Sequence, residues 1–306
     1  MNKITVIGTG AVGSTIAYTL ATQGIATDIL LIDIATEKAE GEALDILQAA
    51  TFSHPFNIKA GNYEDAVGSD IVVLTSGVAR KPGQSRLDLA QINVNITKSI
   101  IPQITKYAPD ATYVIVSNPV DVLTYTFMKC SGIPENKIIG SGTSLDTSRL
   151  CTTLGGMYNV NPADVNAYTI GEHGDSSFTP WSLANIAGMP IEEFNKDVEL
   201  NKEEVETFVR KSGGEIIRKK GATFYAVCVS VCHICKALAN STDTILPVGT
   251  MFHGEYGIDD VCMSLPTRVG NMTANGKVLL PLNDEEIEKL KKSANALKEV
   301  INGVEI

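Results

Sequence analysis

A histidine lies between two glycines in the segment Gly-Glu-His-Gly-Asp, residues 171–175, which follows the apolar stretch 165–170. Imidazole gains and loses a proton near neutral pH, which makes His173 a candidate for acid/base chemistry. The chain has only 4 histidines, and a single histidine can equally be a capped or core residue. The segment alone leaves both interpretations open.

An acid and an arginine, Asp146 and Arg149, stand one helical turn apart in a stretch with helical character. Such a pair is either part of a site or an exposed salt bridge, which would stabilise a helix by roughly 0.2–0.5 kcal/mol. Three of the arginines, Arg80, Arg86 and Arg149, lie beside Gly-rich or strand-end segments. Guanidinium groups at such places could clamp a carboxylate through two parallel hydrogen bonds.

A glycine-rich loop, Gly-Thr-Gly-Ala-Val-Gly at residues 8–13, follows an apolar run and opens a helix-like segment at 14–23. Its glycines allow a tight turn and a close approach to a pyrophosphate, which would bind the free N–H groups of the helix start. Asp33 follows about 20 residues later, where its carboxylate would accept hydrogen bonds from ribose hydroxyls and repel a 2′-phosphate. The pattern predicts NAD rather than NADP, and a glycine turn without a nucleotide is the alternative.

Short β-branched runs alternate with helix-length segments in the first half of the chain, and the runs lie at residues 4–7, 29–32, 71–74 and 113–116. Continuous apolar strands are typical of a parallel sheet that is covered on both faces. We therefore predict an α/β fold, with a Rossmann-type doubly wound parallel sheet forming an NAD-binding domain at residues 1–142.

The pattern changes in the second half to longer helical segments and antiparallel pairs, including a turn expected at Asn275-Gly276. Asn283 and Glu286 predict the start of a last, amphipathic helix. We expect an α+β substrate or catalytic domain at residues 143–306, packed tightly on the first domain with the active site between them.

The charge balance limits the partners. The chain has 306 residues, 44% of them hydrophobic, and a net charge of −10. A nucleic acid or an anionic membrane would need a concentrated positive surface, so neither is expected as a partner. The sequence lacks the roughly 18 uninterrupted apolar residues of a membrane span and the flanks of a signal peptide. We expect a cytoplasmic protein that binds a small molecule.

The 6 cysteines are expected to be free thiols, because no secretion signal precedes them. Cys228, Cys232 and Cys235 recur at helical spacing. They could form a metal site, but small buried residues on a packed helix are the simpler interpretation, so no metal is expected.

Five motifs occur in the order found in the L-lactate/malate dehydrogenase superfamily. They are the 8–13 loop with Asp33 and the segments 76–86, 117–121, 145–149 and 171–175. The chain resembles this superfamily from end to end, and most of all its lactate-dehydrogenase-like malate dehydrogenases. The resemblance implies an NAD-dependent enzyme that forms a homodimer or homotetramer. The remote alternative, a non-catalytic dinucleotide-binding protein, predicts damage to catalytic positions that are all present here.

The resemblance also implies a role for each site residue. His173 would be the acid/base that exchanges a proton with the substrate oxygen, oriented and made more basic by Asp146. Arg149 would clamp the C1 carboxylate, and Arg86 would polarise the carbonyl. Asn118 would touch both substrate and nicotinamide ribose. The residues expected around the cofactor are Gly8, Gly10, Ala11, Val12, Gly13, Asp33, Asn93, Val116, Ser117 and Asn118.

Arg80 decides the expected substrate. Malate dehydrogenases of the resembling family carry Arg at this loop position, and lactate dehydrogenases carry Gln. Burying Arg80 over the methyl group of pyruvate would cost roughly 3–5 kcal/mol. Pro247, where lactate enzymes usually carry Thr, favours the same assignment. We therefore predict a malate dehydrogenase that interconverts oxaloacetate and (S)-malate, the reaction of the tricarboxylic acid cycle, with malate/oxaloacetate as the dicarboxylate partner.

Two features favour the alternative, an L-lactate dehydrogenase acting on pyruvate and lactate. Glu172, beside the histidine, and the pair Trp181-Ser182 are the residue types found in lactate enzymes. These residues flank the catalytic histidine and need not contact the distal end of the substrate.

Overall fold

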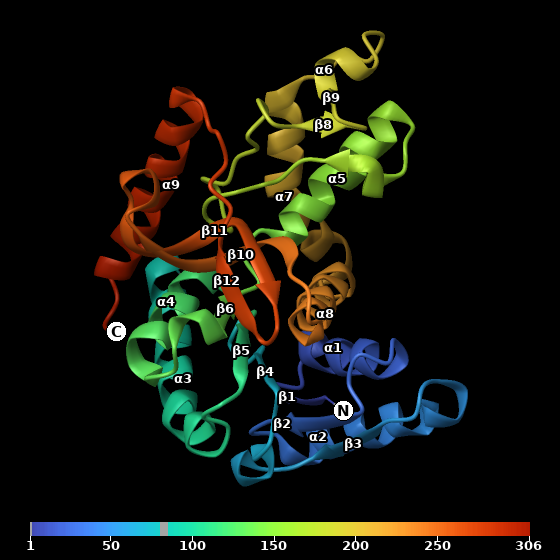
Figure 1. Ribbon diagram of the computed structural model, residues 1–306. Coiled ribbons are helices and arrows are strands. Elements are labelled where there is room, and N and C mark those ends of the chain that lie inside the picture. The colour runs from blue at the N-terminus through green and yellow to red at the C-terminus, as the bar shows by residue number, and fades with distance from the viewer. Residues whose placement is uncertain (1, 80–84) are drawn as a thin grey trace.

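The computed structural model describes residues 2–79 and 85–306. Within these residues nine strands form one sheet in the order β12-β11-β10-β6-β5-β4-β1-β2-β3 (Figure 1). The six strands from β6 to β3 pair in parallel, and their order is that of a dinucleotide-binding doubly wound sheet. The predicted α/β fold is confirmed. The parallel strands are β1 (Lys3–Ile7), β2 (Asp28–Ile32), β3 (Asn57–Ala60), β4 (Ile71–Leu74), β5 (Thr112–Ile115) and β6 (Ile138–Gly140).

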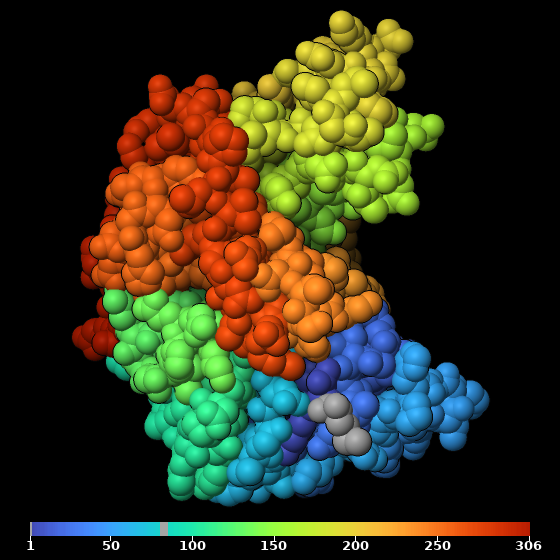
Figure 2. Space-filling view, in the orientation of Figure 1, coloured from blue at the N-terminus to red at the C-terminus, as the bar shows by residue number. Residues whose placement is uncertain are grey.

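Helices cover both faces of this sheet, and a separate group of helices and short strands projects beyond it (Figure 1). The same projection is visible at the top of the space-filling view (Figure 2). The helices are α1 (Ala11–Thr22), α2 (Thr36–Leu47), α3 (Arg86–Tyr107), α4 (Val120–Ser131), α5 (Ser144–Tyr158), α6 (Ile191–Phe194), α7 (Lys202–Lys220), α8 (Tyr225–Ala239) and α9 (Asp284–Asn302). The remaining strands are β7 (Val165–Asn166), β8 (Asn185–Ile186), β9 (Met189–Pro190), β10 (Thr244–His253), β11 (Asp259–Gly270) and β12 (Thr273–Lys277). Short 3₁₀ helices lie at Gln48–Phe52, Tyr63–Ala66, Glu135–Lys137, Pro162–Asp164 and Glu255–Gly257.

Two-sided burial explains why the parallel strands read as unbroken apolar runs. In β4, Val72 and Leu74 face a core shared with α3, α4 and α9, whereas Ile71 and Val73 face a core shared with α1, α2 and α8. Successive side chains of a strand point to opposite faces, so both faces need apolar residues. The cysteines of α8 pack inside the second core, where small apolar residues are required.

The antiparallel strands continue the same sheet. β10 joins β6 through the pair Gly249 and Gly140, and β11 pairs along nearly the whole of β10. The domain boundary at residues 142/143 therefore stays a proposal, since the sheet itself runs across it. A third apolar core holds the elements that project at the top of Figure 1, where α5 and α7 pack with β7 and β8.

The last hairpin turns earlier than the sequence suggested. Asn271 and Met272 both have positive φ and connect β11 to β12, whereas Asn275-Gly276 lies inside β12. A two-residue hairpin turn with both φ angles positive matches the twist of the flanking strands. The prediction of a turn at 275–276 was therefore wrong. The amphipathic last helix does begin where expected, with Asn283 as the N-cap of α9.

No helix in the described part of the chain combines the length and the apolar character needed to cross a membrane.

Gly13 tests how α1 packs on β1. A Cβ atom at this position would lie 1.8 Å from the carbonyl oxygen of Gly8 and 2.8 Å from Thr75 Oγ1. The change Gly13→Ala must displace the helix, so we expect it to destabilise the fold by about 1–3 kcal/mol or more in urea unfolding. As a control, Gly41→Ala in α2 meets no atom within 4 Å and should stabilise by roughly 0.5–1 kcal/mol. Equal stability of Gly13→Ala and the unchanged chain would refute this account.

Candidate active site

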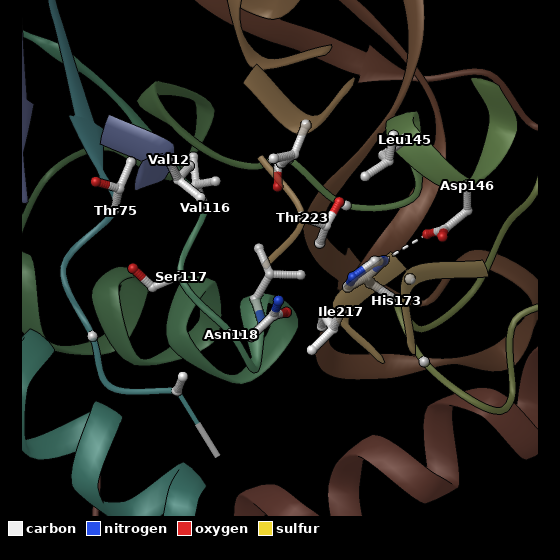
Figure 3. A pocket seen from close by; sticks show the side chains of 18 of the residues that line it. Val12, Thr75, Val116, Ser117, Asn118, Leu145, Asp146, His173, Ile217 and Thr223 are labelled. Atoms are coloured by element: carbon white, nitrogen blue, oxygen red, sulfur yellow. Dashed lines mark hydrogen bonds and ion pairs between the residues drawn. The ribbon is translucent and has the colours of Figure 1, made fainter. Parts of the chain in front are cut away.

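A cavity of about 500 Å³ lies at the carboxyl ends of the parallel strands (Figure 3). One wall comes from the loops after β4, β5 and β6, and the other from α5, α7, α8 and the 173–175 segment. Ligands of doubly wound sheets bind at this edge, where the strand order reverses between β1 and β4. The cavity brings together eight of the predicted site residues: Val12, Asn93, Val116, Ser117, Asn118, Asp146, Arg149 and His173.

One carboxylate holds the two main polar groups of the cavity. Asp146 Oδ2 lies 2.5 Å from His173 Nδ1 (Figure 3). Asp146 Oδ1 accepts a hydrogen bond from Arg149 Nη1 at 2.9 Å. The side chains of Asp146 and Arg149 are only 7% and 13% exposed. This burial excludes the exposed helix salt bridge as an explanation for the pair.

Ser264 of β11 fixes the two segments that carry these groups. Its hydroxyl accepts a hydrogen bond from the N–H of Thr143, just before α5, at 3.0 Å. Its backbone pairs in both directions with Gly171, two residues before the histidine. Thr143 in turn donates its hydroxyl to the carbonyl of Thr169. The α5 terminus and the histidine segment are therefore held against one strand.

The charge of Asp146 sets the protonation of His173. It raises the pKa of His173 to about 9, although burial of the imidazole acts in the opposite direction. Burial would raise the pKa of Asp146, but the charges of His173 and Arg149 outweigh it and lower that pKa. At neutral pH the imidazole is therefore cationic. Because Nδ1 is engaged by Asp146, Nε2–H is the proton that a ligand in the cavity can receive.

Arg86 lies at the rim, at the start of α3, and not in this cavity. Its guanidinium pairs with Asp175, and both side chains are largely exposed. It lines a smaller adjoining cavity that also reaches His173. Arg80, on which the predicted substrate depended, lies outside the described residues.

The glycine loop forms a cradle that fits a pyrophosphate. Gly8 has φ +96°, and α1 begins after Gly10 without a side-chain cap, which leaves the first amides of the helix available. A Cβ added to Gly10 would meet nothing within 4 Å, so the space beside these amides is open. Backbone amides with the positive end of a helix dipole favour an anion.

Asp33 follows β2 with its orientation fixed. Thr9 donates its backbone N–H to Oδ2 at 2.6 Å, and Ala35 donates to Oδ1 at 2.9 Å. Burial raises the pKa of Asp33, but these hydrogen bonds outweigh it, and the net shift is downward. The group is therefore an anion with acceptor capacity left for hydroxyls.

Asn93 of α3 acts as a brace between two loops. Its side chain accepts from the N–H of Val78 at 2.9 Å and donates to the carbonyl of Asn118 at 2.7 Å. Ser117 similarly donates its hydroxyl to the carbonyl of Ser76 at 2.7 Å. These bonds shape the wall of the cavity, and direct contact of Asn93 or Ser117 with a cofactor stays a prediction.

The sequence analysis placed one pocket residue wrongly and missed another. Pro247 lies in β10 opposite Pro266, and its carbonyl accepts a hydrogen bond from Ser144 Oγ. It is absent from the described lining of the cavity, whereas Thr223, between α7 and α8, is part of that lining (Figure 3). The only signal for Thr223 was that it is the one polar side chain in the short connection, residues 221–224, between two helices.

Both halves of the chain match known families. Residues 2–140 match the lactate/malate dehydrogenase NAD-binding domain, and residues 143–305 match the lactate/malate dehydrogenase α/β C-terminal domain. The L-lactate dehydrogenase of Clostridium botulinum (strain Hall) is 48% identical over 305 residues, which cover 98% of this chain and 96% of that enzyme. The L-lactate dehydrogenase of Acetivibrio thermocellus is 44% identical over 311 residues, which cover 100% and 98%.

Solved structures agree. The minor L-lactate dehydrogenase from Enterococcus mundtii superposes with a TM-score of 0.96 at 37% identity, covering 100% of this chain and 99% of that chain. MGS-M5, a lactate dehydrogenase from a Medee basin deep-sea metagenome library, superposes with a TM-score of 0.94 at 36% identity, covering 99% and 98%.

These relatives contradict the predicted malate dehydrogenase of the tricarboxylic acid cycle, because all four are lactate dehydrogenases. The prediction depended on Arg80, which lies outside the described residues, and on Pro247, which is not among the described lining residues of the cavity. Two further arginines at or near the cavity are each paired with a carboxylate. Arg210, which lines the cavity, is paired with Glu206, and Arg86 is paired with Asp175.

The His173 pKa depends on Asp146 in a way that can be measured directly. The change Asp146→Asn removes the negative charge beside Nδ1, so we expect the pKa of His173 to fall from about 9 to near its ordinary value of 6.5 or below. Proton NMR of the histidine Cε1–H signals against pH measures it, with His173→Gln assigning the resonance.

The exposed pair of His253 and Glu135 supplies the matched control. Glu135→Gln removes a carboxylate from another histidine and should leave the His173 titration unchanged. An Asp146→Asn variant that titrates like the unchanged chain would overturn the electrostatic explanation.

Proposed function

The chain belongs to the lactate/malate dehydrogenase family, and from this premise we propose that it is an L-lactate dehydrogenase that interconverts pyruvate and L-lactate. It is an NAD-dependent 2-hydroxyacid dehydrogenase. The choice of pyruvate as the 2-keto acid is the proposal, and the names of its relatives support it.

The observation that carries the proposal is a cluster in the cavity that can bind one carboxylate and donate one proton, formed by Arg149, His173 and Asp146. Protonated His173 and Arg149 contribute two positive charges, and Asp146 neutralises one of them. The guanidinium of Arg210 is neutralised by Glu206, at 3.1 Å. With Arg86 held by Asp175, these described groups carry one net positive charge, which suits the binding of one carboxylate. The choice of pyruvate over oxaloacetate follows from the lactate dehydrogenase relatives.

The proposed mechanism follows from the positions of these groups. The cofactor, when bound along the 8–13 loop, would supply the hydride for the carbonyl carbon. Arg149 holds the substrate carboxylate by two hydrogen bonds, and His173 Nε2–H gives its proton to the carbonyl oxygen as negative charge develops there. Asp146 keeps the imidazole in one orientation through Nδ1 and stabilises its cation before transfer. In the reverse direction neutral His173 removes the hydroxyl proton of lactate.

Arg86 has a different part in the proposal. In this structure it is bound to Asp175 at the rim, so it must leave that carboxylate to reach a substrate oxygen in the cavity. Once there, its guanidinium would stabilise the developing charge on the carbonyl oxygen. Asn118, which lines both cavities, would contact substrate and nicotinamide ribose.

The NAD cofactor has a matching site along the sheet edge. We propose that the amides of the 8–13 loop hold its pyrophosphate and that Asp33 accepts hydrogen bonds from the adenosine ribose. Val12 and Val116 line the path from this loop to His173. The homodimer or homotetramer implied by the family resemblance also stays part of the proposal.

Substrate choice can be tested by following NADH oxidation with pyruvate and oxaloacetate in parallel. An L-lactate dehydrogenase should have a kcat/KM for pyruvate at least about tenfold higher than for oxaloacetate. His173→Gln, which removes the proton donor, is the inactive control. A preference for oxaloacetate would refute the proposed substrate.

The two reaction directions should respond oppositely to pH. Reduction of pyruvate needs the imidazolium, which is present below the His173 pKa of about 9, so its kcat/KM should fall as the pH rises through 9. Oxidation of lactate needs neutral imidazole, so its kcat/KM should rise over the same range. Profiles that bend in the same direction for both substrates would argue against His173 as the acid/base.

A further inference from the structure

A second carboxylate lies directly behind His173. Asp121, in the first turn of α4, accepts the backbone N–H of His173 on Oδ2 at 2.7 Å. Asp121 is only 2% exposed to solvent. Its other oxygen, Oδ1, is buried without a hydrogen-bond partner among the described residues. The proposed mechanism makes no use of this group.

The sheet leaves room for this carboxylate. A Cβ atom at Gly249 of β10 would lie 3.4 Å from Asp121 Oδ1. Gly249 is the residue through which β10 pairs with Gly140 of β6. Asp121 therefore lies where the parallel and antiparallel strands meet, in hydrogen-bond contact with the histidine segment. The titratable groups facing it are His173, Glu172 and Asp146, with the Cys262 thiol from β11.

A neutral acceptor would make the same backbone bond at a lower cost. Burial of a carboxylate is unfavourable unless it is paired, and here it raises the pKa of Asp121 to about 7. The nearest opposite charge is the imidazolium of His173, which in turn is favoured by the negative charge of Asp121. The two groups therefore stabilise each other's charged forms. The remaining charges near His173 are those of Asp146, Arg149, Glu172 and the Asp175–Arg86 pair.

We propose that Asp121 is a positioning residue for His173, which fixes its backbone through Oδ2 and adds a second negative charge that stabilises the imidazolium. This inference rests on the proposed function only in taking His173 as the proton donor. Asp146 acts on the ring through Nδ1, whereas Asp121 acts from the backbone side, so the histidine is held from two elements, α5 and α4.

Two substitutions separate position from charge. In Asp121→Asn the amide oxygen can still accept the His173 N–H, but the charge is lost. We expect an unchanged fold and a His173 titration midpoint lower by about one pH unit in the NMR measurement, with the pH profile of pyruvate reduction displaced equally. Asp121→Ala removes the backbone bond as well, and should also lower kcat about tenfold or more with little change in KM.

Glu286→Gln is the matched control. Glu286 is also a buried carboxylate, and it accepts hydrogen bonds from Ser182 and Asn283 rather than from the histidine segment. Its loss should leave the His173 midpoint in place. An Asp121→Asn midpoint equal to that of the unchanged chain, or an equal shift in Glu286→Gln, would overturn the proposal.

The NMR measurement needs no substrate, so the two proposals can fail separately. If the chain does not reduce pyruvate but Asp121→Asn lowers the His173 midpoint, the proposed function is wrong and this inference holds. Normal pyruvate reduction with an unshifted midpoint would do the reverse. If Asp121→Ala does not fold, Asp121→Asn still decides the contribution of the charge.

Discussion

The Asp146 carboxylate is the contact around which the cavity is organised, because it bonds to His173 with one oxygen and to Arg149 with the other. A buried carboxylate would be costly if it were alone, and these two cations offset that cost. The same contact keeps the imidazole protonated and leaves one positive charge for a ligand. In the proposed mechanism, proton donation by His173 and carboxylate binding by Arg149 therefore both depend on this single buried group.

The fold holds that contact in place by joining its two halves through one sheet. Ser264 on β11 forms hydrogen bonds with the start of α5 and with the histidine segment. β10 pairs with β6 through Gly249 and Gly140. The cofactor cradle lies on the parallel half of this sheet, at the carboxyl ends of its strands. The histidine segment beside β11 and the glycine loop after β1 are thus positioned by strands of one continuous sheet.

Much of this could be predicted from the sequence, for physical reasons. Two-sided burial gives β1, β2, β4 and β5 their apolar runs, so these four parallel strands were predicted correctly. The other two parallel strands were not predicted, because β3 is partly exposed and β6 is only three residues long. Pairings between distant segments carry no local signature. The last hairpin turns at Asn271-Met272 because its register is set against β11, although Asn275-Gly276 is the stronger turn sequence. Likewise, neither the placement of Thr223 in the cavity nor the bond between Asp121 and His173 follows from a local pattern.

The substrate prediction depended on two single residues, Arg80 and Pro247, and the lactate dehydrogenase relatives overturned it. Arg210 lines the cavity but is neutralised by Glu206, which also accepts a hydrogen bond from Trp181 at 2.8 Å. Trp181 is one of the residue types that favour a lactate enzyme. It donates a hydrogen bond to Glu206, the carboxylate that neutralises Arg210. What a cavity accepts depends on the sum of its paired charges. The net charge of −10 over the whole chain says nothing about that sum.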